Sequence, residues 1–321
     1  MLSYNRPEQI DRILKKLQSA SAGDFNLIIK DDCSPRQDEI KAIVESHSGK
    51  HNFDVIFHKN KSNLGYDRNL LDAFNITESE YVFLLSDDDF VVGERLFDLI
   101  QILSKREHKL YFTPYIDKLS QCRINIGKFN INKFNEVIYN SILFSGLIFD
   151  RKSVIELPKD ELFLSNCIYS QVFLASLIAY KERDFGRASS DLLYLGGDGK
   201  NFFGENQSAV NSEVLRNRTS ITSNLKYQNF LLAVVASVSK STDASIYKLF
   251  IAEYNRRLIS YLLRARSLGL SGFRELTTSI RNSNIDLAWY IRPAMYFFLI
   301  IPDFIARSLR RCLIGCFKKA G

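Results

Sequence analysis

Residues 81–89 read YVFLLSDDD: an apolar run that ends in three consecutive aspartates, Asp87, Asp88 and Asp89. An unbroken apolar run of this length is typical of a strand that is buried on both faces. Adjacent carboxylates repel one another, so three of them at the end of a buried strand need a positive charge between them. We therefore predict that this strand ends at a cation-binding site.

Other apolar runs repeat this pattern, at residues 25–29, 53–57 and 110–113. Two stretches between the runs have apolar residues at helical spacing: Ile10, Ile13, Leu14 and Leu17, then Leu96, Leu99, Ile100 and Leu103. Strands that alternate with amphipathic helices predict an α/β fold, in which helices cover both faces of a parallel sheet. Ligands of such sheets bind beyond the carboxyl ends of the strands, so the acidic residues that end the strands should face one crevice.

A second acidic segment lies at the end of the run at 25–29, where Asp31 and Asp32 occur in the sequence IIKDDCS. A carboxylate at this position could accept a hydrogen bond from a pyrimidine ring or bind a ribose hydroxyl. The alternative is a helix N-cap, because Ser34 and Pro35 follow and a helix is predicted after them.

Residues 60–70, NKSNLGYDRNL, predict a loop with a tight turn at Gly65, followed by a helix. Arg68, near the start of that helix, could face a phosphate; the alternative is a purely structural turn. The sequence contains neither GxxxxGK(S/T) nor GxGxxG, so it does not indicate P-loop ATP hydrolysis or dinucleotide binding.

The cation that best fits the aspartate triplet is Mg²⁺ or Mn²⁺. These ions prefer oxygen ligands, keep several waters, and are often held by one or two carboxylates together with the phosphates of a substrate. The triplet would then bind a metal that arrives with a diphosphate. The alternative is a solvated acidic turn that caps a helix starting near Glu94.

Four segments resemble the motifs of the family 2 glycosyltransferases in order and spacing: SYNRPEQI at 3–10, DDCS at 31–34, NLGYDRN at 63–69 and SDDD at 86–89. The resemblance covers roughly residues 1–180. It implies a GT-A-like fold, in which a Rossmann-type sheet binds the nucleotide, here with a helical C-terminal extension. Within the family the sequence is most similar to bacterial O-antigen and capsular polysaccharide sugar transferases. Family members usually have a longer apolar strand before the first motif, where this sequence has only Met1 and Leu2.

The resemblance implies a nucleotide-sugar site built from these segments. Tyr4 and Arg6 would lie beside the nucleotide. Asp32 would bind the base, with Asp31 in support. Arg68 would lie near the diphosphate or the ribose.

The resemblance assigns the aspartate triplet to the ribose and to the divalent metal. Asp87 would belong to the nucleotide-sugar site and Asp88 would be the first metal ligand, with Asp89 as a second candidate. The implied reaction is a direct displacement at the anomeric carbon with inversion, in which a base takes the proton of the attacking acceptor hydroxyl. The metal would neutralise the charge that grows on the departing nucleoside diphosphate.

The catalytic base is not evident from the motifs. Relatives often carry an acidic residue just before an aromatic helix, but the matching stretch here, NCIYSQVFLASL at 166–177, has no carboxylate. Asp160 and Glu161 are the nearest acids and are therefore the candidate catalytic residues. Gln171 could contact the donor or the acceptor; the alternative is a buried polar residue with a local partner.

The net charge of +7 is concentrated near the C-terminus. Residues 287–321 contain six basic residues and a single acidic one, Asp303, interleaved with aromatic and aliphatic side chains. This composition fits the headgroup region of an anionic membrane better than a nucleic acid; the alternative is a helix packed on the protein's own core. The longest apolar run there, 294–301, is far shorter than the roughly 20 residues of a membrane-spanning helix.

We therefore predict three parts: a GT-A-like domain at 1–205, a helical extension at 206–285 and a membrane-associating tail at 286–321. The predicted enzyme moves a sugar from a nucleoside diphosphate donor to a lipid-linked oligosaccharide, on the cytoplasmic face of a bacterial inner membrane. A nucleotidyltransferase is one alternative, and a catalytically degenerate protein that binds sugar nucleotides or scaffolds polysaccharide assembly is another. With 46% hydrophobic and 25% charged residues the chain is not a disordered protein.

Overall fold

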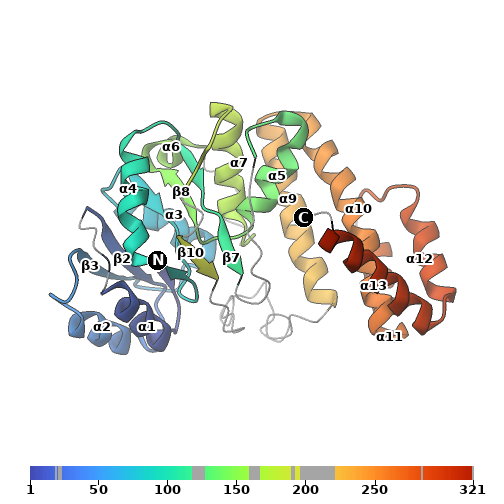
Figure 1. Cartoon of the computed structure of the whole chain (residues 1–321), viewed down its shortest axis with the longest axis horizontal. Coiled ribbons are helices and arrows are strands. Elements are labelled where there is room, and N and C mark those ends of the chain that lie inside the picture. The colour runs from blue at the N-terminus through green and yellow to red at the C-terminus, as the bar shows by residue number, and fades with distance from the viewer. Residues whose placement is uncertain are drawn as a thin grey trace.

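The computed structural model describes residues 1–18, 20, 24–117, 127–158, 167–188, 192–195, 221–282 and 285–319. Strands and their covering helices occupy one side of the molecule, and a group of long helices occupies the other (Figure 1). The predicted α/β fold with a helical C-terminal extension is confirmed.

The N-terminal residues form a parallel three-stranded sheet with the order β3-β2-β1. These strands are β1 (Leu2–Ser3), β2 (Asn26–Asp31) and β3 (Asp54–Lys59). The helices between and after them are α1 (Pro7–Leu17), α2 (Gln37–Ser46) and α3 (Tyr66–Ile76). The predicted apolar stripe of α1 is buried, because all four of its members pack into the core beside the sheet.

A second sheet has the order β4-β8-β6-β9. Its strands are β4 (Tyr81–Phe83), β8 (Leu147–Asp150), β6 (Leu110–Phe112) and β9 (Gly186–Arg187). The expected parallel pairing does not extend to β8, which runs antiparallel to both β4 and β6. A continuous apolar run does not encode strand direction, and the chain enters β8 through a turn at Gly146, whose φ of 89° suits glycine.

The two sheets meet at one parallel bridge between Leu2 and Ser86. A cavity of about 540 Å³ lies between β2 and β4, with Met1 and Leu2 in its lining. Its lining includes residues 26–28 of β2 and residues 81–85 on the side of β4. Among the described residues, the first and second sheets are therefore joined at the carboxyl ends of β1 and β4, which face the predicted crevice.

A small third sheet follows the aspartate triplet directly. It has the order β5-β10-β7, with β5 (Phe90–Val91), β10 (Leu193–Leu195) and β7 (Tyr115–Asp117). The 3₁₀ helix η1 (Gly93–Arg95) and helix α4 (Leu96–Ser104) come next along the chain. Neither η1 nor α4 has a side-chain cap, so the triplet does not cap the helix near Glu94.

The remaining regular elements of the described chain are helices. They are η2 (Ile131–Lys133), α5 (Phe134–Ser141), α6 (Arg151–Glu156), α7 (Ser170–Glu182), α9 (Ile221–Ser241), α10 (Ala244–Leu268), α11 (Leu270–Arg281), α12 (Ile291–Ile300) and α13 (Asp303–Lys319). No helix within the described ranges combines the length and apolar character that crossing a bilayer requires.

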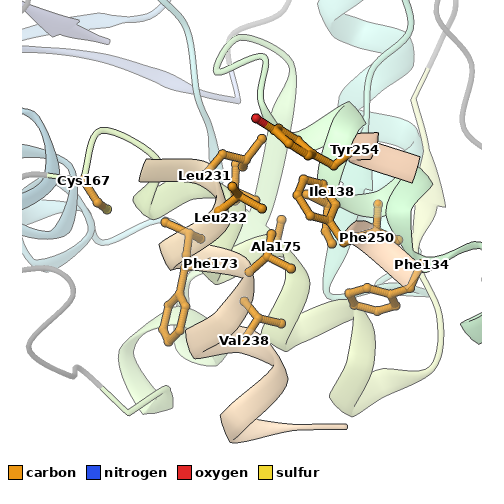
Figure 2. Packing of buried hydrophobic residues seen from close by; sticks show 14 of the residues in the cluster. Phe134, Ile138, Cys167, Phe173, Ala175, Leu231, Leu232, Val238, Phe250 and Tyr254 are labelled. Carbon is orange, nitrogen blue, oxygen red and sulfur yellow. The ribbon is translucent and has the colours of Figure 1, made fainter. Parts of the chain in front are cut away.

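One apolar core joins the helices to the second sheet. Figure 2 shows part of it, with Phe134 and Ile138 from α5, Phe173 and Ala175 from α7, Leu231, Leu232 and Val238 from α9, and Phe250 and Tyr254 from α10. The same cluster continues into Phe149 of β8 and into Met295 of α12. The C-terminal helices are therefore fixed on the α/β part by shared side-chain packing, and the predicted boundaries at 206 and 286 remain predictions.

Candidate active site

The carboxyl ends of three strands meet at one edge of the joined sheets. Ser3 of β1 pairs with Asp31 of β2, and Leu2 bridges to Ser86 just before the aspartate triplet. The segments that follow these residues therefore start side by side. The structure thus brings together the first, second and fourth motifs.

A buried contact links the first motif to the triplet. The Nε atom of Arg6 lies 3.8 Å from an Oδ atom of Asp87, and both residues are buried. Arg6 directly precedes Pro7, the first residue of α1, so the start of that helix fixes the position of the guanidinium. The charge on Asp87 therefore has a cationic neighbour supplied by the protein, which partly answers the need for a positive charge at this strand end.

The three aspartates differ in their exposure. Asp87 and Asp89 are buried, whereas Asp88 is partly exposed. One oxygen of Asp88 accepts a hydrogen bond of 2.6 Å from the hydroxyl of Ser86. The backbone N–H of Ser86 in turn donates to the hydroxyl of Ser145, at 2.8 Å, which fixes the turn before the triplet. Asp88 is therefore the carboxylate of the triplet that is best placed to bind a soluble ligand.

The residues at the triplet fit a Mg²⁺ or Mn²⁺ ion that is bound together with a diphosphate. Among the described residues, no group of three or more histidine, cysteine or acidic side chains is arranged to hold a metal. Mg²⁺ and Mn²⁺ do not need such a cage, because one or two carboxylates suffice when a substrate supplies phosphate oxygens. Asp88, open and oriented by Ser86, suits a metal that is bound jointly with a diphosphate.

Asp32 holds the loop between β3 and α3. One of its oxygens accepts hydrogen bonds from the Asn60 amide and the Leu64 backbone N–H, both at 2.7 Å, and the other accepts from the Gly65 N–H at 2.9 Å. Burial raises the pKa of Asp32, although these donors oppose the rise. Asp32 therefore positions the Gly65 loop at the crevice, and its role in base binding remains a prediction.

Asp31 stabilises the turn that follows it. Its two oxygens accept hydrogen bonds from the backbone N–H and the hydroxyl of Ser34, at 2.9 and 2.6 Å. Burial is the main cause of the raised pKa of Asp31. Helix α2 begins only at Gln37 and has no side-chain cap, so the N-cap alternative does not describe either aspartate. Between them, Cys33 takes a φ of 58°, which shows how sharply the backbone turns at this strand end.

Tyr4 and Arg68 are the more open of the predicted nucleotide contacts. Tyr4 is partly exposed directly after β1, and Arg68 is exposed on the first turn of α3. The loop before Arg68 is fixed by Asp32, and its Gly65 has a φ of 76°. Arg68 is therefore mounted on a helix whose start is held at the crevice, as a phosphate contact requires.

Asp67 was not among the predicted site residues, although it lies in the motif NLGYDRN. It is fully buried and accepts hydrogen bonds from the backbone N–H groups of Ile168 and Ser170, at 3.0 and 3.2 Å. Burial raises its pKa, and these donors oppose the rise. Asp67 therefore ties the start of α3 to the start of α7, a contact that sequence spacing could not reveal.

Gln171 has two partners inside the protein. Its Oε1 atom accepts a hydrogen bond of 2.8 Å from the Tyr66 hydroxyl, and its Nε2 atom donates to the Ile142 carbonyl at 3.1 Å. The side chain is buried, as the local-partner alternative predicted. Asp160 and Glu161, the predicted catalytic acids, lie outside the described residues.

The fold of this chain has counterparts among solved structures. Solved structures with the GT-A fold resemble this chain over most of its length. S. aureus TarS has a TM-score of 0.56 at 15% identity, covering 92% of this chain and 51% of that chain. A fragment of the same protein, residues 1–349, in complex with UDP-GlcNAc has a TM-score of 0.52 at 15% identity and covers 87% and 90%. At this identity the likeness establishes the fold alone, and it confirms the predicted GT-A-like architecture.

The sequence comparison gives a family match for the N-terminal part of the chain. Residues 1–135 match the model of glycosyl transferase family 2, which confirms the resemblance that the four motifs indicated. Abequosyltransferase RfbV of Salmonella typhimurium is 26% identical over 96 residues, which are 29% of this chain and 28% of that protein. The uncharacterized glycosyltransferase MJ1057 of Methanocaldococcus jannaschii is 30% identical over 97 residues, covering 30% and 33%. This chain thus spans about a third or less of the relatives that it matches.

Proposed function

We propose that this protein transfers a sugar from a nucleoside diphosphate donor to a lipid-linked saccharide, with inversion and with a divalent metal. The observation that carries the proposal is the crevice in which Arg6 contacts Asp87 beside the open carboxylate of Asp88. A buried cation and an oriented carboxylate at the ends of adjacent strands suit a nucleotide whose diphosphate brings a metal. The family match over residues 1–135 supports the same reaction class.

Each residue of the crevice has a distinct proposed role. Asp88 would hold the metal, with Asp89 as a second ligand, while Asp87 stays beside Arg6 and faces the ribose. Asp32 would contact the base through the loop that it positions. A bound Mg²⁺ or Mn²⁺ would supply Lewis-acid stabilisation of the leaving diphosphate. The chain itself orients the donor through these side chains.

The proposed donor is a sugar nucleotide and the proposed setting is bacterial surface polysaccharide synthesis. A structural relative, S. aureus TarS 1–349, has been solved with UDP-GlcNAc, and a sequence relative is named an abequosyltransferase. We propose a lipid-linked acceptor, which would place the enzyme on the cytoplasmic face of the inner membrane. The proposed catalytic acids remain Asp160 and Glu161.

One observation favours a second candidate function. In the described part of the chain the start of α7 carries Gln171 rather than an acid, and Gln171 is already bound to Tyr66 and Ile142. A protein that binds a sugar nucleotide without turning it over would show this arrangement. Binding and turnover therefore have to be measured separately.

The test is a thermal-shift screen of sugar nucleotides with and without Mn²⁺, followed by donor hydrolysis with each nucleotide that stabilises the fold. Asp88→Asn should abolish the manganese-dependent part of the thermal shift and of donor hydrolysis, because it removes the open carboxylate. Asp98→Asn is the matched control, since Asp98 is exposed on α4 and pairs with Arg95. Binding without hydrolysis would favour the second candidate, and no stabilisation by any sugar nucleotide would contradict both.

A further inference from the structure

The exposed apolar side chains of this protein are concentrated at its C-terminal end. Of the nine large hydrophobic residues that are exposed in the described part of the chain, seven lie between Trp289 and Leu309. Isolated exposed hydrophobic residues are ordinary, but a contiguous group of them marks an interaction surface. The group is Trp289, Tyr296, Phe297, Leu299, Ile300, Phe304 and Leu309, which we call the aromatic face.

Packing on the protein's own core explains only the inner side of α12. Ile291, Met295 and Phe298 are buried in the shared core, as a core-packed helix requires. The outer side is apolar as well, with Tyr296 60% exposed and Ile300 78% exposed. A helix that is apolar on both sides is stable in water only if something covers its outer side. Burial in the core therefore leaves the aromatic face unexplained.

The aromatic face is held rigidly by a buried arginine. Arg266 of α10 donates hydrogen bonds to the carbonyl groups of Phe298 and Ile301, at 2.8 and 2.7 Å, and forms an ion pair with Asp303. These bonds fix the turn between α12 and α13. Phe304, 69% exposed just beyond this turn, is therefore displayed by a fixed structure and not by a frayed end. Figure 1 shows this helical pair at the end of the molecule away from β2 and β3.

Arginines accompany the exposed aromatic residues. Arg292, Arg307 and Arg311 are exposed on α12 and α13, and the guanidinium of Arg281 lies 5.3 Å from the centre of the Tyr296 ring. The acidic Asp303 is engaged by Arg266. Basic side chains beside protruding aromatic and aliphatic ones complement a surface that offers phosphates above an apolar layer.

We propose that the aromatic face docks on the surface of an anionic bilayer. Phe297, Ile300 and Phe304 would enter the boundary between headgroups and acyl chains, and the neighbouring arginines would contact lipid phosphates. This inference names the surface that would hold the protein on the membrane in the proposed function. It rests on the proposed function only in taking the acceptor to be lipid-linked. A second copy of the chain is the competing occupant, but it would bring the same positive charge into the contact.

The sequence provides its own reporter for the test. Trp289 is the single tryptophan of the chain and is 86% exposed within the aromatic face. The full chain is mixed with vesicles of phosphatidylcholine alone or with added phosphatidylglycerol, and tryptophan emission is recorded together with vesicle flotation. We expect a blue shift, quenching by brominated lipid and flotation with the anionic vesicles, and weaker binding at high salt.

Two variants decide whether the aromatic face is responsible. Phe297→Ser, Ile300→Ser and Phe304→Ser combined should weaken vesicle binding at least about tenfold, because the inserted apolar area is lost. Phe97→Ser is the matched control, since Phe97 is also exposed, at 53%, but lies on α4. Both variants should unfold at the wild-type temperature and hydrolyse free donor at the wild-type rate, so loss of docking is distinguishable from failure of the proposed reaction.

Three results would overturn the proposal. One is equal binding of the triple variant and the wild type, and another is no emission shift with anionic vesicles. The third is a dimer in gel filtration that the triple variant dissociates, without any vesicle binding, which would assign the aromatic face to a second copy.

Discussion

The guanidinium of Arg6 lies 3.8 Å from the carboxylate of Asp87, and both side chains are almost fully buried. The contact joins the start of α1 to the aspartate triplet that follows the apolar run at 81–85. It places a fixed cation beside the site proposed for the metal and diphosphate. Because the contact is long for an ion pair, its contribution to the free energy of unfolding has to be measured as a coupling energy between the two residues.

Arg6→Ala should lower the free energy of unfolding by about 3 kcal/mol, since the buried carboxylate of Asp87 loses its cationic neighbour. Asp87→Asn should relieve most of this loss when combined with Arg6→Ala. Urea unfolding of the two single variants and the double variant gives the coupling energy, which should exceed about 0.5 kcal/mol. Strict additivity of the single effects would show that the two side chains do not interact.

Asp32→Ala should release the Gly65 loop. Three hydrogen bonds from Asn60, Leu64 and Gly65 lose their acceptor, so we expect a loss of about 2 kcal/mol in unfolding free energy. Amide hydrogen exchange should accelerate at Leu64 and Gly65. Asp54→Asn, at an exposed position at the start of β3, is the control. Unchanged exchange at Gly65 would mean that other contacts hold the loop.

Gln171→Leu tests whether Gln171 is a ligand contact or a structural link. Because it binds Tyr66 and Ile142 within the protein, the variant should lose about 2 kcal/mol of stability. Its KM for the donor found in the nucleotide screen should stay unchanged. Tyr66→Phe should remove part of the same stability, with less than additive effect in the double variant. A raised KM at unchanged stability would instead support the predicted contact with donor or acceptor.

Asp67 should give the fold a distinctive pH dependence. Burial raises its pKa above the ordinary value of 3.8 in the folded state, so the folded protein binds the proton more tightly than the unfolded chain. The stabilisation from this proton is fully present below about pH 4 and is lost as the pH rises through the folded-state pKa. Unfolding free energies should therefore fall, relative to those of Asp67→Asn, as the pH rises from 4.

The comparison of Asp67→Asn with the wild type is made by urea unfolding at several pH values between 4 and 7. The difference should change by at most about 1.4 kcal/mol per pH unit, the limit for one proton. Asp98→Asn is the control, because Asp98 is exposed on α4. Parallel curves for the wild type and Asp67→Asn would show that the pKa of Asp67 is not raised in the fold.

The sequence alone determined the local elements and the positions of the acidic residues. The stripe of α1 and the runs of β2, β3 and β6 could be predicted because side-chain periodicity reflects local backbone geometry. Motif order was sufficient to indicate the match of residues 1–135 to glycosyl transferase family 2 and the GT-A-like fold.

Which residues meet depends on how the elements pack together in space. The tertiary structure set the antiparallel direction of β8, the contact of Arg6 with Asp87, and the burial of Asp67 against the start of α7. It also showed that Arg266 holds the turn that displays the outer side of α12. Periodicity shows which side of an element is apolar. Strand direction, hydrogen-bond partners and the exposure of a second apolar side depend instead on packing against segments that are distant in the sequence.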